Sequence, residues 1–309
     1  MKYSVEERFQ IPYIRLKFIL VLSEDSILPK EKVSALRGGM GEMLLRQNCI
    51  GMRDCKNCSF EEACIVRSTV YTRMKRKPAF MQGDDSIGYL LECENYRTDF
   101  EAGEELSFYL TLFGNNLVYF GQYLQAFYQL GVNGVGKYHA QYQIKEIRNG
   151  REEKILENQT VHMKNYRIET VGAYVEKRIR ALKLQGCKSM LTFYTPLCLK
   201  FQGEYLREFR SEGIFQAAFR RVMMLDYFVE KYIEKPEFAD YPAIVKQNVQ
   251  EKTVPRYSSN HANKIWMKGI VGQVSFDRIP EEVFPYLAAG ELLHIGKNSS
   301  FGFGRYRIE

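Results

Sequence analysis

The sequence predicts an α+β protein in which two domains repeat one order of elements: strand, helix, strand, strand, helix, strand. A chain of 309 residues is long enough for two domains of about 150 residues each. Both halves show the alternating and helical hydrophobic patterns that this order requires. Each half also closes on a glycine-x-glycine-basic-tyrosine motif, at residues 134–138 and 302–306. We therefore expect two tandem ferredoxin-like (βαββαβ, RRM-like) domains.

The first domain is expected to span residues 1–155, and its elements follow from hydrophobic periodicity. Apolar residues at every second position mark the strands, and apolar residues three or four positions apart mark the helices. The expected elements are a strand over 10–22, a helix over 33–44, strands over 87–93 and 106–113, a helix over 117–130 and a strand over 137–147. A cysteine-rich insertion, over about 48–85, separates the first helix from the second strand.

The second domain is expected to span residues 156–309 and to repeat the same order. Its expected elements are a strand over 190–201, a long amphipathic helix over 214–229, a strand over 270–276 preceded by a partner strand or bulge at 264–269, and a short helix over 280–293. A glycine-rich loop and a last short strand close the chain. The two sheets would offer a platform, and the space between the domains a groove, for an extended ligand.

The glycine-rich loop between residues 293 and 308 combines groups suited to phosphate. Glycines let backbone N–H groups approach an anion closely, and a lysine and two serines stand among them. His294, just before the loop, would offer proton transfer near neutral pH. An ordinary tight turn is the alternative interpretation of the loop. The residues expected to bind an RNA backbone are Gly296, Ser299, Ser300, Gly302, Gly304, Arg305, Arg307, Lys268, Arg220 and Arg221.

Positive charge is clustered along the chain, whose formal net charge is +7. Residues 160–221 contain 12 Lys or Arg against 5 Asp or Glu, and residues 65–80 contain five basic residues and no acidic one. Such clusters favour a polyanion such as nucleic acid, with a solvated basic surface as the alternative. The N-terminus has no apolar segment typical of a secretory signal, so we expect a cytoplasmic protein without membrane association.

Four cysteines in the insertion, Cys49, Cys55, Cys58 and Cys64, have the spacing C-x5-C-x2-C-x5-C. Four thiolates in one loop would form a tetrahedral structural zinc site. Reduced thiols without a ligand, as expected in a reducing cytoplasm, and an iron–sulfur cluster are the alternatives.

The sequence lacks the signatures of nucleoside-triphosphate binding, of serine nucleophiles and of two-metal nucleases. Its residues suit a metal-independent reaction on RNA, because RNA supplies its own nucleophile, the 2′-hydroxyl. Such a reaction needs a base, an acid and cations around the phosphate. His294 is the first candidate for proton transfer, since phosphate-binding groups surround it in sequence, and His261 is the second.

The end of the chain, Glu291–Tyr306, resembles the C-terminal glycine-rich signature of the Cas6 family, the CRISPR precursor-RNA processing endoribonucleases of the RAMP superfamily. The segments Pro255–Ser259 and Met267–Gly272 are also similar to this family. Thr195–Leu197 and the cysteine cluster resemble a branch associated with type III systems. The resemblance implies tandem ferredoxin-like domains that bind the CRISPR repeat. It also implies one metal-independent cut per repeat, which leaves a 2′,3′-cyclic phosphate and a 5′-hydroxyl.

The resemblance implies no catalytic cofactor, repeat RNA as the main partner and a type III effector complex as a further one. It also suggests roles for individual residues. The expected catalytic residues are His294 as acid or base, Lys297 and Arg256 as charge-stabilising groups, Tyr257 as a second proton-transfer group and His261 in reserve.

The chain departs from the family pattern at two places. Many members carry a catalytic histidine on the first helix, but residues 30–48 contain none. A common Arg-Gln pair is replaced here by Asn260-His261. The main alternative function is therefore a non-catalytic RAMP subunit that binds crRNA or serves as a scaffold of an effector complex. A zinc-dependent nucleic-acid adaptor is a third hypothesis.

Overall fold

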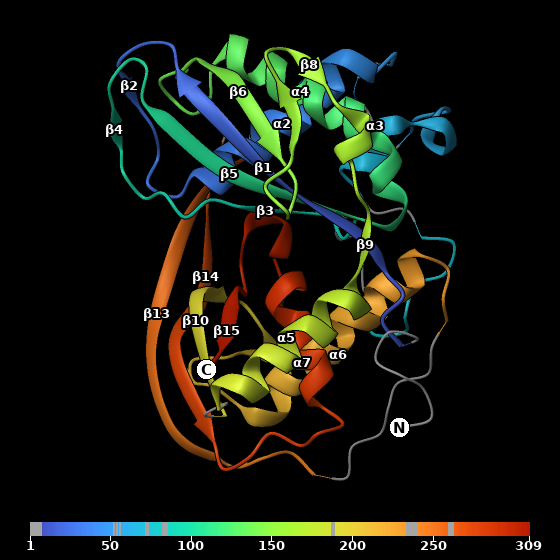
Figure 1. The fold of residues 1–309 in the computed structure, drawn as a ribbon, viewed down its shortest axis with the longest axis vertical. Helices are drawn as coiled ribbons and strands as arrows, with labels where there is room; N and C mark the ends of the chain where they lie inside the picture. The colour runs from blue at the N-terminus through green and yellow to red at the C-terminus, as the bar shows by residue number, and fades with distance from the viewer. Residues whose placement is uncertain are drawn as a thin grey trace.

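The computed structural model shows two units stacked along the long axis, the N-terminal half above and the C-terminal half below (Figure 1). Each unit contains an antiparallel sheet with helices packed on it. The structure describes residues 8–51, 53, 55, 57–71, 74–81, 86–186, 189–232, 240–258 and 263–309, without the side chains of residues 257, 258, 263 and 264. No helix within these residues is long and apolar enough to cross a membrane.

The first unit has the element order and the strand order of a ferredoxin-like domain. Its strands lie side by side as β3-β5-β1-β6, and β7 (Lys154–Glu157) and β8 (Thr160–Val161) extend the sheet beyond β6. The six elements of the domain are β1 (Pro12–Leu22), α2 (Lys32–Asn48), β3 (Tyr89–Glu92), β5 (Glu105–Phe113), α4 (Phe120–Asn133) and β6 (Tyr142–Arg148).

The helices α2 and α4 close the core of the first unit. Leu36, Met40 and Leu44 stand three or four positions apart on α2 and are fully buried. They belong to one hydrophobic cluster with Phe18 of β1 and Phe127 of α4, whose rings lie 5.2 Å apart. Because helical spacing and strand alternation bury the same cluster, the hydrophobic pattern determines which faces meet.

The second unit repeats the order with strands β13-β14-β10-β15 side by side. Its six elements are β10 (Met190–Leu197), α6 (Ser211–Phe228), β13 (Ile244–Ser258), β14 (Asn263–Phe276), α7 (Phe284–Leu293) and β15 (Tyr306–Ile308). A further helix, α5 (Val171–Gln185), lies with α6 and α7 beside the sheet (Figure 1). The expectation of two tandem ferredoxin-like domains in an α+β fold is confirmed.

Short elements connect these parts. They are β2 (Ser26–Ile27), η1 (Glu61–Ala63), α3 (Ile65–Thr69), β4 (Asp99–Phe100), η2 (Gly114–Tyr119), η3 (Met163–Asn165), β9 (Glu169–Thr170), β11 (Lys200–Phe201), β12 (Glu204–Tyr205) and η4 (Ser299–Phe301). β9 pairs with the start of β1 and so joins the link between the domains to the first sheet. The expected division into residues 1–155 and 156–309 falls within β7 and stays a prediction.

Two elements of the second half have no counterpart in the hydrophobic pattern. The helix α5 begins at Thr170, whose hydroxyl accepts a hydrogen bond from the N–H of Ala173 (3.2 Å), a threonine cap that the sequence does offer. The strand β13 was not expected at all, and β14 begins at residue 263, where a separate partner or bulge was expected. β13 escapes the pattern because it is mostly polar, and Val254 is its only fully buried residue among those described.

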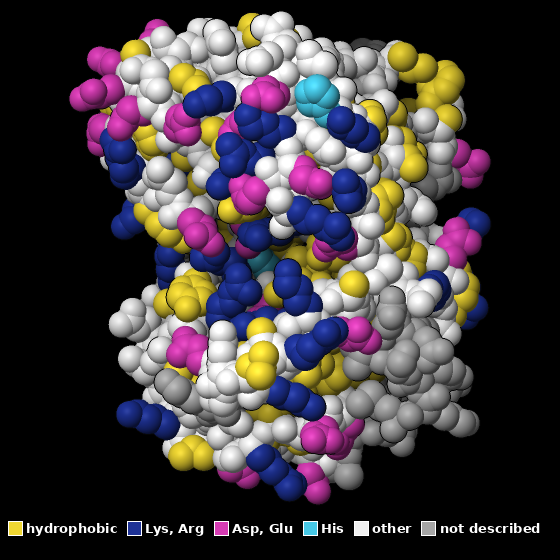
Figure 2. Space-filling view, in the orientation of Figure 1, with side chains coloured by type: hydrophobic (Ala, Val, Ile, Leu, Met, Phe, Trp, Pro, Cys, Tyr) yellow, Lys and Arg dark blue, Asp and Glu magenta, His cyan; other side chains and the backbone are white. Residues whose placement is uncertain are grey.

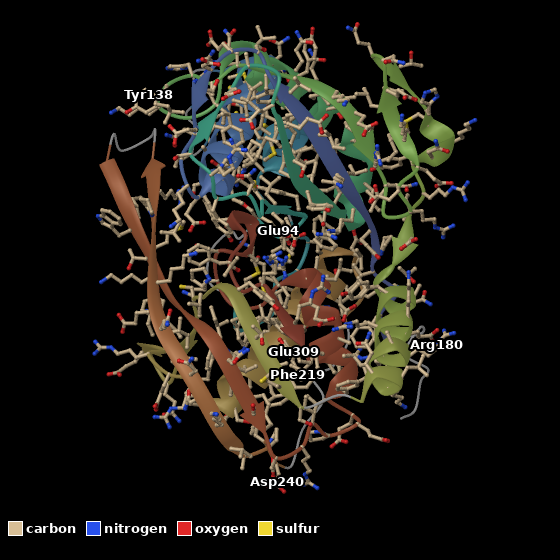
Figure 3. The ribbon with its side chains drawn as sticks, turned by 60° about the vertical axis from the view of Figure 1, so that its left-hand side comes forward. Glu94, Tyr138, Arg180, Phe219, Asp240 and Glu309 are labelled. Carbon is tan, nitrogen blue, oxygen red and sulfur yellow. The ribbon has the colours of Figure 1, made fainter. Side chains whose placement is uncertain are left out.

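The hairpin formed by β13 and β14 rises from the second sheet along the side of the first unit (Figures 1 and 3). Lys252 of β13 forms an ion pair with Glu31 at the start of α2 (2.9 Å). Glu94, which Figure 3 shows at the junction of the two units, forms an ion pair with Arg305. The hairpin and the loop before β15 therefore both bind the second unit to the first.

The two glycine-x-glycine motifs occupy equivalent places, between the second helix and the last strand of each unit. The first glycine of each pair, Gly134 and Gly302, has φ of 83° and 78°, and the second, Gly136 and Gly304, has φ of 77° and 72°. Residues with a side chain rarely adopt a positive φ, which accounts for glycine at these four positions. The first glycines differ in ψ, which is 146° at Gly134 and 9° at Gly302, so the repeated motif shares its positive φ angles but not its full backbone conformation.

Candidate nucleic-acid interface

A cleft of about 660 Å³ lies between the two units. The segment Gly296–Phe301, which contains η4, forms one wall of it. Six Lys or Arg side chains line this cleft, and no Asp or Glu is among the described residues that line it. Such a surface attracts anions, because no carboxylate in the wall offsets the positive charge. The six cations are Arg37, Lys200, Arg220, Arg221, Arg256 and Lys297.

Lys297 is placed in the wall by backbone contacts of its own loop. Its N–H donates to the carbonyl of Cys198, at the end of β10 (2.7 Å). Gly296 precedes it with φ of 83°, and a Cβ there would lie 2.7 Å from the same carbonyl oxygen. The ammonium of Lys297 is 6.0 Å from the ring centroid of Tyr205. The loop therefore presents the lysine beside the β11–β12 hairpin.

The serines and glycines that follow divide between the cleft and the interior. Ser299 and Ser300 line the cleft but are only 7% and 6% exposed, so most of each residue packs inward. A Cβ on Gly302 would lie 3.0 Å from the carbonyl oxygen of Leu91 in β3, and one on Gly304 would lie 1.8 Å from that of Ile295. Gly302 therefore permits close packing against the first unit and Gly304 permits close packing within its own loop, and neither lines the cleft.

Arg37 and Arg256 converge on one aromatic ring in the cleft. The guanidinium carbon of Arg37, from α2, is 4.1 Å from the ring centroid of Phe301, and that of Arg256, from β13, is 4.5 Å from it. Nη2 of Arg37 donates to Oγ of Ser86 (3.0 Å). Burial lowers the pKa of Arg256, and the charge of Arg37 lowers this pKa further. Both domains thus contribute a cation to the same point.

The two arginines of α6 have different surroundings. Arg220 lines the cleft, where its guanidinium carbon lies 5.5 Å from the ring centroid of Phe80. Arg221 is 3% exposed, and its Nε donates to the carbonyl of Leu293 at the end of α7 (2.9 Å). Arg220 can therefore contact a ligand, while Arg221 holds the helix that leads into the loop.

His294 is fully buried behind the loop. Its Nδ1 donates to the carbonyl of Phe303 (3.1 Å), and its Nε2 faces a carboxylate oxygen of Glu92 in β3 (3.4 Å). Burial lowers the pKa of His294, although Glu92 acts in the opposite direction. Burial would raise the pKa of Glu92, but His294 and Arg15 together lower it to about 2. This geometry does not support the expected role of His294 as acid or base, because a ring without exposed surface cannot contact a phosphodiester.

Three basic residues that were expected to bind RNA also lie outside the cleft. Arg305 and Arg307 line a second cleft, of about 910 Å³, whose wall also contains three carboxylates. Arg305 forms an ion pair with Glu94, and Arg307 lies 3.9 Å from Glu291. Lys268 is exposed on β14. Figure 2 shows Lys and Arg side chains gathered across the waist of the molecule, with Asp and Glu side chains among them. The second cleft is thus less purely positive than the first.

Two expected proton-transfer residues lie where the structure describes little. The backbone of Tyr257 belongs to β13 and pairs with Lys264 of β14, but its side chain is outside the description. His261 lies between the two strands and is also outside the described residues. The roles of Tyr257 and His261 therefore stay predictions. In the sequence both residues follow Arg256 within five positions.

Arg37 and Lys200 line the cleft and were not expected there. Arg37 stands at helical spacing with Met40 and Leu44, both buried, so a cation within an apolar stripe is the signal that could have found it. Lys200 carries no comparable signal, because only the turn of the β11–β12 hairpin brings it to the loop.

The four cysteines of the insertion surround one cavity of about 260 Å³. Burial raises the pKa of Cys55, and the nearby thiols of Cys64, Cys49 and Cys58 add to this effect. Within the described part of the chain, no three or more His, Cys, Asp or Glu are grouped so that they could hold a metal ion. Structural zinc therefore stays a prediction, supported by the shared cavity and not by ligand geometry.

Two family models match the chain. A model described as CRISPR-associated endoribonuclease Cas6 matches residues 191–306. A second model, AF_1859_N, described as an N-terminal domain, matches residues 11–170, which is just over half of the chain. The first match covers nearly all of the second sheet with its two helices, and the second covers the first unit.

One relative and two solved structures match nearly the whole chain. A protein of Archaeoglobus fulgidus described as uncharacterized is 24% identical over 315 residues, covering 97% of this chain and 99% of that protein. Solved structures of a partial and of a full Cas6-RT-Cas1–Cas2 complex contain chains that match 97% of this chain at a TM-score of 0.59 and 10% identity. This chain spans 46% and 29% of their lengths, and at this identity the likeness concerns the fold alone.

Proposed function

Since the chain belongs to the Cas6 family of CRISPR-associated endoribonucleases, we propose that it binds CRISPR repeat RNA and cleaves precursor crRNA within the repeat. The observation that carries this proposal is the cleft between the domains, which six cations and no carboxylate line among the described residues. Phosphate groups along an RNA strand would replace the missing counter-charges. The cleft lies between the two domains, where an extended single strand could contact both of them.

The proposed reaction is attack of the 2′-hydroxyl on the adjacent phosphate. The 2′-oxygen forms a bond to phosphorus as its proton leaves to a base, and the bond to the 5′-oxygen breaks as that oxygen gains a proton. The products are a 2′,3′-cyclic phosphate and a 5′-hydroxyl. Negative charge grows on the non-bridging oxygens in the transition state, where positioned cations lower the barrier most.

Lys297 and Arg256 are the proposed charge-stabilising groups, because both line the cleft from the second domain. Lys297 can also act as a proton donor to the leaving oxygen. Tyr257 and His261 remain the proposed proton-transfer groups, since they stand within five residues of Arg256 in the sequence. His294 is withdrawn from this role because its ring is buried.

The proposed reaction needs no metal ion. Two-metal nucleases hold their ions with carboxylates, and the part of the cleft lining that the structure describes has none. The cationic side chains would perform the charge neutralisation that metal ions perform elsewhere. Zinc, if the cysteine cavity holds it, would be structural and lie apart from the cleft.

The decisive experiment incubates the protein with RNA containing the matched CRISPR repeat in the presence of EDTA. We expect one cut per repeat, with cyclic-phosphate and 5′-hydroxyl ends. A substrate with a 2′-deoxy group at the scissile position should remain intact. A requirement for added metal, or cleavage of the deoxy substrate, would contradict the proposal.

A non-catalytic subunit that binds crRNA is the second candidate. It is favoured by one observation: no histidine lines the cleft within the part of the chain that the structure describes. Tight binding of repeat RNA without cleavage by the wild-type protein would support this candidate. Association with a type III effector complex is a proposal common to both functions, and co-purification with such a complex tests it.

A further inference from the structure

The ring of Phe301 brings together one arginine from each domain. Arg37 belongs to α2 of the first domain and Arg256 to β13 of the second, and both guanidinium carbons lie within 4.5 Å of the ring centroid. The two guanidinium groups are also close enough to each other for the charge of Arg37 to lower the pKa of Arg256. Each flat guanidinium packs on the ring, which fixes its orientation.

Arginines that lie close to one another usually have carboxylate partners, and Arg37 and Arg256 have none among the described residues. Among the described residues, neither Arg37 nor Arg256 has a carboxylate within salt-bridge distance. Nε of Arg37 is buried without a hydrogen-bond partner, and the hydroxyl of the fully buried Tyr89 has none either. Tyr89 lies near enough to influence the pKa of Arg256. Buried donors without acceptors, beside two cations, indicate the place of an anion.

We propose that Arg37 and Arg256 together hold the scissile phosphate, so that each domain supplies half of the site. The proposal rests on the function proposed above and deepens it. Guanidinium groups present parallel N–H donors that match two oxygens of a phosphate. Charge on those oxygens increases as the 2′-oxygen attacks, so the pair binds the transition state more tightly than the substrate.

The position of the pair relative to the loop supports the scissile phosphate over any other phosphate of the strand. Lys297 belongs to the segment Gly296–Phe301, which lines the same cleft as the two arginines. A phosphate at the ring therefore has cations from α2, β13 and the loop around it. The arrangement also requires both domains to keep their relative position, because Arg37 is the cation that the first domain supplies and the other cations come from the second domain.

The test compares single-turnover cleavage at saturating repeat RNA. Arg37→Ala and Arg256→Ala should each slow the reaction about 10²- to 10³-fold, the effect of removing one donor to a developing oxyanion. Arg37→Lys keeps the positive charge but loses the parallel N–H donors of the guanidinium group, so we expect an intermediate rate. The matched control is Arg46→Ala, an exposed arginine on the same helix that pairs with Glu42, and it should not change the rate. An unchanged rate in Arg37→Ala would overturn the proposal.

A binding experiment separates this proposal from the proposed function. With RNA that carries a 2′-deoxy group at the scissile position, Arg37→Ala and Arg256→Ala should each weaken binding several-fold. The double variant should weaken it by less than the product of the two, because both groups contact one phosphate. If the double variant lost as much affinity as the product of the two single losses, or if no variant lost affinity, the proposal of a shared site would be wrong. If the wild type cleaves no RNA, the proposed function fails, while this measurement still decides whether the two arginines share a phosphate. Thermal unfolding of Arg37→Lys checks that folding is intact.

Discussion

His294 directly follows α7, and its ring joins the two units behind the loop. A buried imidazole beside a buried carboxylate stabilises the position of the segment that carries it, and here that segment leads to Lys297. The sequence places a histidine next to a glycine-rich loop, a pattern typical of a proton-transfer site. Only the packing of β3 against the loop decides that the ring faces Glu92 and not solvent.

Replacing His294 tests this interpretation. His294→Asn should lower the free energy of unfolding by about 1 to 3 kcal/mol, because Glu92 would remain buried with one partner fewer. The remaining cleavage activity should keep the pH–rate profile of the wild type, since the ring does not take part in proton transfer. His139→Asn, an exposed histidine in a similar left-handed conformation, is the control. Loss of one limb of the profile in His294→Asn would restore the catalytic role.

Asp226 of α6 is a second buried ionisable group, fully covered and without a hydrogen-bond partner for either carboxylate oxygen within the described chain. Burial raises its pKa from 3.8 to about 7, against the opposing charges of Arg8 and Lys231. The folded state therefore binds the proton more tightly than the unfolded state. This contribution to stability is fully present below about pH 4 and is lost as the pH rises through 7.

Asp226→Asn should remove this pH dependence. At pH 8 the variant should be more stable than the wild type by roughly 1 to 4 kcal/mol, because a buried negative charge is no longer required. Denaturant unfolding at pH 5 and pH 8 measures the difference between the two proteins. Asp240→Asn, at an exposed position, should change stability little at either pH. If the free energy of unfolding changed equally with pH in the wild type and in Asp226→Asn, the pH dependence would not come from Asp226.

At the scale of elements, α5 is joined to α7 and to the last strand by one buried ion pair. Nε and Nη2 of Arg178 donate to the two carboxylate oxygens of Glu291 (2.5 and 2.9 Å), and Nη2 also donates to the carbonyl of Ile308 (2.8 Å). The side chain of Glu291 is fully buried and also accepts from the N–H of Ile308 (2.7 Å). One carboxylate thus fixes three elements around the end of the chain.

Breaking this pair should be costly. Arg178→Ala should reduce the free energy of unfolding by about 3 to 5 kcal/mol, because the charge of Glu291 stays buried without its main partner. Arg180→Ala, an exposed arginine on the same helix, is the control and should have little effect. The double variant Arg178→Met with Glu291→Leu should be more stable than Arg178→Ala. A cost below about 1 kcal/mol for Arg178→Ala would show that the pair is effectively solvated.

The elements also show where sequence patterns succeed and fail. The strand β1 and the helices α2 and α4 were predicted because one face of each is buried, so that the spacing of apolar residues reports the fold directly. The strand β13 was missed because it leaves the sheet and lies beside the other domain, where polar residues such as Lys252 make the contacts. The residues of the cleft divide in the same way. Lys297 lies in a recognisable loop, whereas Arg37 reaches the cleft only through the docking of the domains.

At the scale of the whole molecule, the candidate site belongs to neither domain alone. The second domain contributes the loop, Arg220 and Arg256, and the first contributes Arg37 and the strand β3 that supports the loop. The ion pairs Lys252–Glu31 and Arg305–Glu94 hold the domains together around the cleft. Positive charge that is dispersed through the sequence is thereby gathered on the wall of one cleft.

The sequence by itself determined the two repeated domains, the order of most of their elements, the glycine-rich loop and the resemblance to a nuclease family. These properties follow from periodicity and from local backbone requirements, which the chain carries wherever it folds. The tertiary structure alone decided that His294 is covered, that Arg305 and Arg307 lie outside the cationic cleft, and that Arg37 lies inside it. Burial and the pairing of distant charges depend on which surfaces meet, and no pattern within one segment contains that information.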